Sequence, residues 1–415
     1  MSHKAYLWTV ATAFLIACGL SATINYLVDP YGLFGIERVA GLNAIKPAAA
    51  DHLRTVKPYQ VRRNAPRTLI GGNSRPEAGI DPASACWHPE DRPVYNLGVP
   101  GAGLYMQFRY IQNSLLDGHT KTVLLGIDLV DFLVPDRFGG DFAAWPGQAQ
   151  AFEARLRYRA DGTANPSYRL HALGDRLAAL FSLNALADSM TTLVAQSNPN
   201  ATNREATGFN PGRDFYDIIA AEGQNLLFVQ KNREMQNRLN PNAVIFQDGS
   251  DWSTAFESLS RLLRAAKSVD ARVILFINPY HADYLATIDA RGLWDILEEW
   301  KRRLVRLTSN RSNTVLWDFN GFNTFTTEQP PPRGDTSSVL RWFWEPAHYR
   351  PAFGNLMLAA MLQRPCGTPA EDPPPGVRLD SFNIEPHLAR LRDERTRFLK
   401  AHPEVQDRLR ASLNR

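Results

Sequence analysis

The sequence predicts an α/β fold with a doubly wound, parallel, five-stranded sheet, a helical insertion and an N-terminal transmembrane helix. Five short apolar runs alternate with helix-like segments, which is typical of parallel sheets with helices on both faces. A long uncharged apolar run near the start predicts the membrane helix. We expect four parts in the 415 residues: an anchor at 1–29, a connector at 30–65, the α/β domain at 66–366, and a linker with a charged helical tail at 367–415.

The membrane helix is predicted over residues 6–28, which carry no charge. Such a run can cross a hydrocarbon core about 30 Å thick. Lys4 precedes it and Asp29 follows, so the positive-inside tendency leaves the short N-terminus in the cytoplasm and the bulk of the chain outside. A lipoprotein signal ending at Leu15-Ile-Ala-Cys18 and an ordinary cleaved signal peptide are the alternatives. Apolar residues continue to Val28, which favours an uncleaved anchor.

A segment rich in proline and glycine follows the predicted membrane helix. The connector then contains one short helix, and the alternation of strands and helices begins after it. The expected strands are continuously apolar, as buried parallel strands are. They lie at 67–72, 93–97, 122–127, 272–277 and 314–319. The helices expected between and after them lie at 104–116, 252–267, 282–307 and 350–362. Right-handed crossovers would place these helices on both faces of the sheet.

Residues 136–250 interrupt this alternation with helical runs near 150–158, 174–195 and 214–238 and a polar loop at 196–211. We interpret them as a largely helical insertion and a candidate cover for the site.

Beyond Pro365 the pattern fades into a Pro/Asp-rich linker. Residues 387–415 are dense in charge, which indicates a solvated helical tail. The alternative is a helix that binds a membrane surface or a partner. The acidic residues in this segment argue against the membrane-surface helix.

Composition excludes several function classes. A net charge of +4, from 46 basic and 42 acidic residues, does not suggest nucleic-acid binding. The chain has no zinc-type Cys/His spacing, no Walker loop and no EF-hand loop, so we expect no metal and no cofactor. Gly98-Val-Pro-Gly101-Ala-Gly103 lacks the order of glycines that binds dinucleotides. It indicates either a turn that lines a site or an ordinary turn between two elements. Cys86 and Cys366 either form a bridge or remain two buried thiols.

Polar residues follow the expected strands, where parallel sheets bind their ligands. Ser74 follows the first strand in Gly71-Gly72-Asn73-Ser74-Arg75. A serine at this turn is exposed and close to backbone N–H groups, but it needs a base to become a nucleophile. The alternative is that Ser74 only caps a helix.

Trp342-Phe-Trp-Glu345-Pro-Ala-His348-Tyr349 supplies a candidate base and acid. Histidine can act as base and then as acid near neutral pH, and a carboxylate bonded to its ring would fix its tautomer. Glu345 lies one turn before His348 if the segment is helical; a helix-capping pair is the alternative. His281 competes as a pocket-lining histidine, with only Asp283 as a nearby carboxylate.

Together these motifs resemble the SGNH (GDSL-like) hydrolase superfamily, whose sheet is flavodoxin-like. They are Gly-x-Asn-Ser74-Arg75, Asn96-Leu-Gly98 before a helix, Leu-Gly126-Ile-Asp128, and acid-x-x-His-Tyr near the C-terminus. More narrowly, they resemble the membrane-anchored bacterial branch related to proteins that acetylate alginate and other surface polysaccharides. The resemblance covers roughly residues 66–135 and 270–363.

The resemblance implies roles for particular residues. Ser74 would be the nucleophile, His348 the base and Glu345 the triad acid. The Ser74 N–H and a glycine of the turn, Gly98 or Gly101, would form the oxyanion hole, with Arg75 and His281 beside it.

Two positions depart from the family. Aspartate is usual where Glu345 stands, and the side-chain oxyanion donor, usually asparagine, is here Asp128. Either Asn96 replaces that donor, Asp128 has another role, or oxyanion stabilisation is weak.

The resemblance therefore implies a periplasmic, single-pass inner-membrane esterase or O-acyltransferase. It would act on acyl esters of a cell-envelope glycan and be anchored through residues 6–28. A non-catalytic scaffold that binds polysaccharide or an assembly partner is the alternative. A third possibility is a transport accessory whose insertion and tail dock to a membrane protein.

Overall fold

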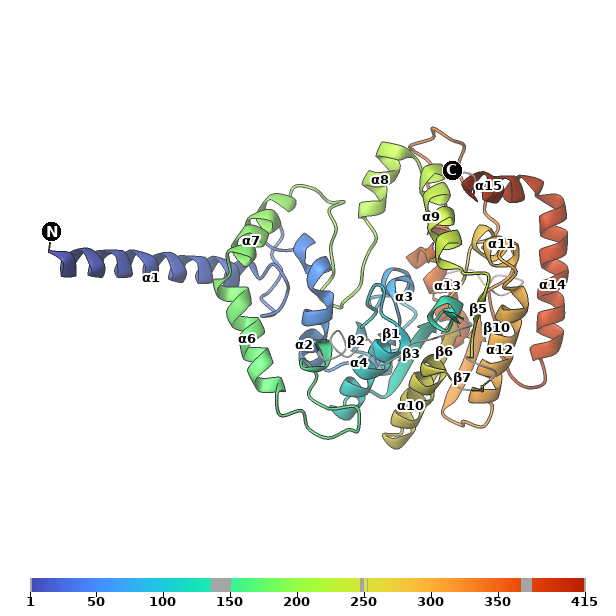
Figure 1. The fold of residues 1–415 in the computed structure, drawn as a ribbon, viewed down its shortest axis with the longest axis horizontal. Coiled ribbons are helices and arrows are strands. Elements are labelled where there is room, and N and C mark those ends of the chain that lie inside the picture. Colours follow the sequence, from blue (N-terminus) through green and yellow to red (C-terminus); the bar gives the residue numbers. More distant parts are fainter. Residues whose placement is uncertain (1, 136–150, 247–249, 252, 367–374, 414–415) are drawn as a thin grey trace.

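The computed structural model describes residues 2–135, 151–246, 250–251, 253–366 and 375–413. Its centre is a six-stranded sheet in the order β10-β7-β6-β3-β1-β2 (Figure 1). The five predicted strands are confirmed and all pair in parallel. They are β1 (Thr68–Gly71), β2 (Val94–Asn96), β3 (Thr122–Ile127), β6 (Arg272–Ile277) and β7 (Thr314–Asp318). Taken in chain order, these five run 2-1-3-4-5 across the sheet.

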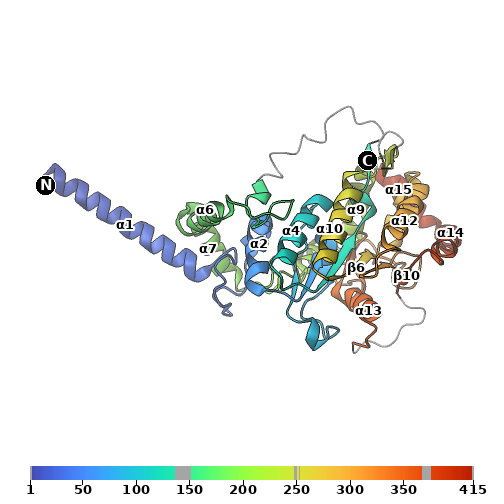
Figure 2. The ribbon, with the colours of Figure 1, turned by 90° about the horizontal axis from the view of Figure 1, so that it is seen from below.

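Both faces of the sheet are covered by helices, because alternate strand residues point to opposite sides. Val123 and Leu125 of β3 join one apolar cluster, and Leu124 joins a second. The first cluster holds α4 (Leu104–Leu116), α10 (Thr254–Ser268) and α12 (Trp294–Thr308), and the second holds α13 (Pro351–Leu362). Figure 2 shows α4 and α10 on one side of β6 and α13 on the other. The doubly wound arrangement therefore follows from strands that are apolar on both faces.

The expected helix at 282–307 is divided in two. α11 (Ala282–Ala290) ends before Gly292, which has a φ of +71°, and α12 begins at Trp294. A left-handed backbone at Gly292 stops the first helix, and glycine adopts this conformation without the steric cost of a side chain.

The C-terminal segment corrects the predicted boundary at 366 and the count of five strands. β10 (Val377–Leu379) pairs antiparallel with β7 and adds a sixth strand. α14 (Ile384–Ala401) buries Leu388 and Leu391 in the first core, and α15 (Pro403–Leu413) follows it. His387 Nε2 lies 2.8 Å from Asp318 Oδ2. The charge-dense tail is thus part of the domain, because its leucines pack into the first apolar cluster and β10 pairs with β7.

The sequence left the state of two cysteines open. Cys86 and Cys366 form a disulfide, and Cys18 is free. The bridge joins the start of the α/β domain to the end of α13.

The described part of the insertion is largely helical, while residues 136–150 and 247–249 lie outside the described ranges. It contains α6 (Tyr168–Phe181), α7 (Leu183–Ala195), α8 (Asp214–Glu222) and α9 (Gln224–Arg238). Within the described part of the predicted run at 150–158, the helical residues are 151–153. The two-stranded pairs are β4 (Val134–Pro135) with β5 (Ala243–Val244), and β8 (Phe343–Glu345) with β9 (His348–Tyr349).

The N-terminal apolar run forms α1 (His3–Val28), which projects from the domain in Figures 1 and 2. By length and composition it could cross a membrane. The connector holds a short 3-10 turn (Pro47–His52) and α2 (Leu53–Asn64). The remaining elements are α3 (Ser74–Gly79) and the 3-10 turns Pro89–Asp91 and Leu129–Asp131.

Candidate active site

Ser74 is the first residue of α3, at the carboxyl end of β1. Gly72 turns the chain there with a φ of +136°, and a Cβ at this position would lie 2.8 Å from Gly126 O. Asn73 caps the helix, since its Oδ1 accepts a hydrogen bond of 3.0 Å from Arg75 N–H. In a sheet of order 2-1-3-4-5, the crevice between β1 and β3 is the topological switch point, where such sheets bind ligands. Ser74 therefore stands at the edge best suited to chemistry.

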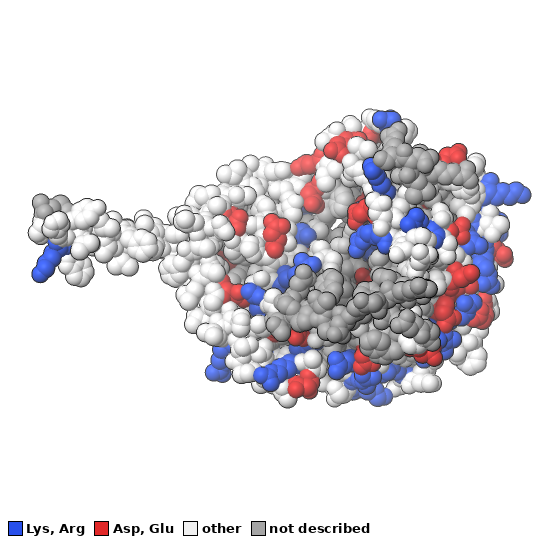
Figure 3. All heavy atoms as spheres, in the orientation of Figure 1, with Lys and Arg blue, Asp and Glu red and all other residues white. Residues whose placement is uncertain are grey.

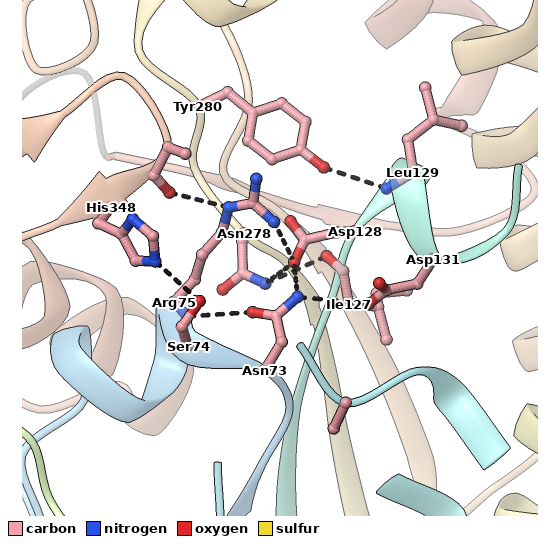
Figure 4. A network of polar contacts seen from close by, with 12 residues as sticks. Asn73, Ser74, Arg75, Ile127, Asp128, Leu129, Asp131, Asn278, Tyr280 and His348 are labelled. Atoms are coloured by element: carbon pink, nitrogen blue, oxygen red, sulfur yellow. Dashed lines mark hydrogen bonds and ion pairs between the residues drawn. The ribbon is translucent and has the colours of Figure 1, made fainter. Parts of the chain in front are cut away.

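Ser74, His348 and Glu345 form one chain of hydrogen bonds. His348 Nε2 lies 2.8 Å from Ser74 Oγ (Figure 4). His348 Nδ1 is hydrogen-bonded to Glu345 Oε1, and Glu345 Oε2 accepts a bond of 2.8 Å from Ala347 N–H. Ser74 and His348 are only partly buried, whereas Glu345 is buried. This is the connectivity that a nucleophile, a base and an orienting acid would need, and the serine is partly exposed.

Glu345 is ionised in this arrangement. Burial by itself would raise the pKa of the Glu345 carboxyl. The charge and hydrogen bond of His348 outweigh burial and hold that pKa below its ordinary value. A charged carboxylate can stabilise the imidazolium that forms when His348 accepts a proton.

Glu345 and His348 lie on a β-hairpin, which corrects the helical turn considered from the sequence. Glu345 of β8 pairs with His348 of β9 across Pro346 and Ala347, and α13 begins only at Pro351. Cross-strand neighbours in an antiparallel pair bring their side chains close together. The three-residue spacing therefore joins acid and base through a hairpin.

The insertion holds this hairpin in place through Gln224, the first residue of α9. Its Nε2 donates to Phe343 O and Trp344 O, each at 2.9 Å, and its Oε1 accepts from Leu340 N–H at 2.7 Å. Gln224 is fully buried. Sequence reasoning missed it, because a polar residue at a helix start carries no local sign of a partner more than a hundred positions away.

The insertion also reaches the back of the serine helix. Arg204 Nε and Lys57 Nζ each lie 2.9 Å from Glu77 Oε1, which belongs to α3. The insertion thus contacts the elements that carry both Ser74 and His348.

Asp128 anchors the site. Its Oδ2 accepts hydrogen bonds from Asn73 Nδ2 at 2.6 Å and Asn278 Nδ2 at 3.0 Å, and it forms an ion pair of 2.7 Å with Arg75 (Figure 4). Tyr349, next to His348, donates to Asn278 Oδ1 at 3.1 Å. A carboxylate with these partners positions its neighbours, which is the second of the three alternatives that the sequence left open.

Arg75 links the serine helix α3 to the hairpin that carries Glu345 and His348. While its guanidinium pairs with Asp128, its Nε donates to Ala347 O at 2.8 Å, in the turn between Glu345 and His348. The same group lies 5.2 Å from the ring centre of Tyr280 and 5.3 Å from that of Tyr284. Because Arg75 follows Ser74 directly, one buried side chain fixes the serine helix against the histidine hairpin.

The predicted oxyanion glycine and asparagine have structural partners. Asn96 Oδ1 accepts from Gly98 N–H at 2.9 Å, and Asn96 Nδ2 donates to Pro76 O and Ile80 O at the end of α3. Asn96 and Gly98 N–H are therefore engaged in holding the helix. Gly101 has a φ of +67°, and no hydrogen bond joins it to Ser74 among the described residues.

His281 is also a structural residue. It caps α11, with its Nδ1 accepting from Asp283 N–H at 3.1 Å and its Nε2 2.8 Å from Glu328 O. Complete burial lowers its pKa. With both ring nitrogens occupied, His281 does not serve as a base for Ser74.

Asp131 is a further carboxylate at the site, and we predict a pH effect from it. Its Oδ2 lies 3.3 Å from Asn73 Nδ2, and desolvation followed by the charge of Asp128 raises its pKa to about 7. Stability contributed by protonated Asp131 is present below pH about 4 and lost as the pH rises through about 7. Asp131→Asn should therefore raise the free energy of unfolding at pH 8 by about 4 kcal/mol and change it little at pH 4. Chemical unfolding at both pH values checks this; an equal effect at both would contradict it.

No group of three or more His, Cys, Asp or Glu side chains is placed to hold a metal ion within the described ranges. The polar residues at the end of the sheet instead form hydrogen bonds and ion pairs with one another. No protein-family model matches this chain, and no curated protein matches it either.

Proposed function

We propose that this protein is a membrane-anchored serine esterase or O-acyltransferase of the SGNH type. The observation that carries the proposal is the continuous contact from Ser74 through His348 to buried Glu345. Ser74 and His348, 274 positions apart in the chain, meet with Glu345 in the order that nucleophilic acyl transfer requires. The 2-1-3-4-5 order of the parallel strands and the position of Ser74 after β1 support the SGNH assignment.

The reaction follows from the contacts. Ser74 Oγ attacks the acyl carbonyl carbon while its proton passes to His348 Nε2. Collapse of the tetrahedral intermediate breaks the ester bond, and His348 gives the proton to the departing alcohol. Water or a sugar hydroxyl then attacks the acyl-enzyme, His348 takes its proton, and the proton returns to Ser74 as the acyl group leaves. Glu345 stabilises the imidazolium in both halves.

The Ser74 N–H is a candidate oxyanion donor. It begins α3 and has no acceptor among the described residues, whereas the N–H of Arg75 is bonded to Asn73. Backbone donors fixed at a helix start stabilise developing negative charge without reorganising.

The two departures from the SGNH pattern fit this proposal. Glutamate in place of aspartate reaches the histidine ring from its own hairpin strand. Asp128 in place of asparagine is bound to Arg75, so its charge is compensated.

We also propose a type of compartment and a class of substrate. An N-terminal helix that could span a membrane and a disulfide between Cys86 and Cys366 favour a domain in an oxidising space such as the periplasm. A cell-envelope glycan carrying O-acyl groups, or an acyl donor for it, is the substrate class suggested by the resemblance to the polysaccharide-acetylating branch.

Fluorophosphonate labelling tests the proposal. Purified full-length protein should form a covalent adduct that peptide mass spectrometry assigns to Ser74, and Ser74→Ala should abolish it. Ser337→Ala is the matched control, because Ser337 is exposed and donates to Asp335 but has no histidine bonded to its hydroxyl in the described structure. Ser337→Ala should label like wild type. Folded protein without an adduct on Ser74 would favour the non-catalytic scaffold.

A further inference from the structure

An exposed apolar face lies on the helical elbow formed by α6 and α7. Six large apolar side chains on it are between 42% and 79% exposed. They are Leu173, Leu177 and Phe181 on α6, and Leu183, Met190 and Val194 on α7. Their spacing places each set on one face of its helix. Soluble proteins rarely leave a contiguous face of this kind uncovered.

The opposite faces of both helices are packed against the protein. Ala172 and Ala179 of α6 and Ala185 of α7 are buried in a small core with the connector. Asp175 on α6 pairs with Arg155, and Asp188 on α7 accepts from Tyr31. The three alanines and the two aspartates thus face the protein, and the large apolar side chains lie on the opposite side of each helix.

The elbow is joined to the end of the membrane helix. Asn25, near the C-terminus of α1, donates to Leu180 O at 2.8 Å and accepts from Ser189 Oγ at 2.8 Å. Figures 1 and 2 show α6 and α7 crosswise at the point where α1 meets the domain. In Figure 3 the edge of the domain next to α1 is largely free of Lys, Arg, Asp and Glu, as α1 itself is. The uncharged surface therefore continues from α1 onto the elbow.

We propose that the α6–α7 elbow lies in the lipid interface of the membrane that α1 crosses. The occupant of the apolar face is the bilayer surface. Helices that lie crosswise to a spanning helix lie along the membrane plane, where an amphipathic helix buries its apolar side among the headgroups and upper acyl chains. Arg169 and Arg176 are exposed beside the apolar face of α6 and suit anionic lipid headgroups.

Helix length and the bend favour the interface over a second crossing. α6 has 14 residues and α7 has 13, each about 20 Å long, against a hydrocarbon core of about 30 Å. The two are bent by 61° at Ser182. Three points of attachment, α1 and the two arms of the elbow, would fix the orientation of the domain and hold the Ser74 site at a constant distance from the membrane.

Fluorescence quenching in vesicles tests this. In a Cys18→Ser background of the full chain, a cysteine at Leu177 or Val194 is labelled with the environment-sensitive dye NBD. The protein is then reconstituted into phosphatidylethanolamine–phosphatidylglycerol vesicles. Phe382→Cys is the control, since Phe382 is 91% exposed and precedes α14, at the end of the domain away from α1. Both elbow labels should emit at shorter wavelength than the control. They should be quenched by nitroxides near the headgroup more strongly than by nitroxides at the bilayer centre.

A second variant separates the elbow from the anchor. Leu173→Glu/Leu177→Glu should remove the quenching of the label at Val194, while α1 keeps the protein in the vesicle; Phe382→Glu should not. Elbow labels that behave like the Phe382 label would overturn the proposal. Stronger quenching at the bilayer centre would overturn it in favour of a second span. Shielding that occurs in native membranes but not in these vesicles would overturn it in favour of a membrane-protein partner.

Discussion

Replacing Ser74 with alanine should lower kcat/KM for a small activated ester, such as p-nitrophenyl acetate, by about 10⁴-fold or more. In the proposed reaction Ser74 Oγ forms the acyl-enzyme, and His348 Nε2 lies 2.8 Å from it. Replacing His348 with alanine should lower kcat/KM by a similar factor, because Ser74 then has no base. The measurement is steady-state hydrolysis with each purified full-length variant.

The double variant distinguishes a triad from two independent contributions. Residues that act as one unit give non-additive losses, so Ser74→Ala/His348→Ala should be no slower than the slower single variant. Ser337→Ala should keep wild-type activity, and thermal unfolding should show that all variants remain folded. Losses that multiply in the double variant would show that the two residues do not act on the same step.

Asp128→Ala should reduce the free energy of unfolding by about 3–5 kcal/mol. Asp128 is fully buried, and its removal leaves the buried Arg75 guanidinium without its counter-charge. The same change takes the acceptor away from the side-chain amides of Asn73 and Asn278. Chemical unfolding of the full-length protein at pH 7 measures the loss.

An exposed ion pair provides the matched control for this prediction. Glu385 pairs with Arg302 at 2.7 Å, but its side chain is 60% exposed. Glu385→Ala should therefore cost no more than about 1 kcal/mol. If the two variants were equally stable, Arg75 would not depend on Asp128. In that case the link between the serine helix and the histidine hairpin would have to come from the Ala347 contact alone.

Most of the sheet could be predicted from the sequence, because its strands are apolar on both faces. The predicted bounds at 122–127 and 272–277 are those of β3 and β6. The sixth strand could not be predicted in this way. Val377–Leu379 is only three residues long and follows a Pro/Asp-rich stretch, and its pairing with β7 depends on an available edge. Likewise, Leu388 and Leu391 become core residues only because α14 folds back onto the sheet.

The site residues were recognisable one by one, but their relations were not. Ser74 after a strand and Glu345 three residues before His348 are visible as patterns. Whether Asp128 opposes an oxyanion or compensates Arg75 depends on contacts between β3 and α3 that no local pattern encodes. Asn96 and His281, which also seemed suitable for chemistry, are held by backbone partners.

The sequence by itself determined the α/β class, the N-terminal apolar helix and the identity of a serine, a histidine and a glutamate as candidates. These follow from periodicity, length and side-chain chemistry, which are local properties. Only the tertiary structure decided that Ser74 and His348 meet across 274 positions, that Glu345 reaches His348 through a hairpin, and that Arg75 and Asp128 fix both halves. Such decisions belong to packing, since a hydrogen bond between distant segments exists only when the whole core brings them within about 3 Å.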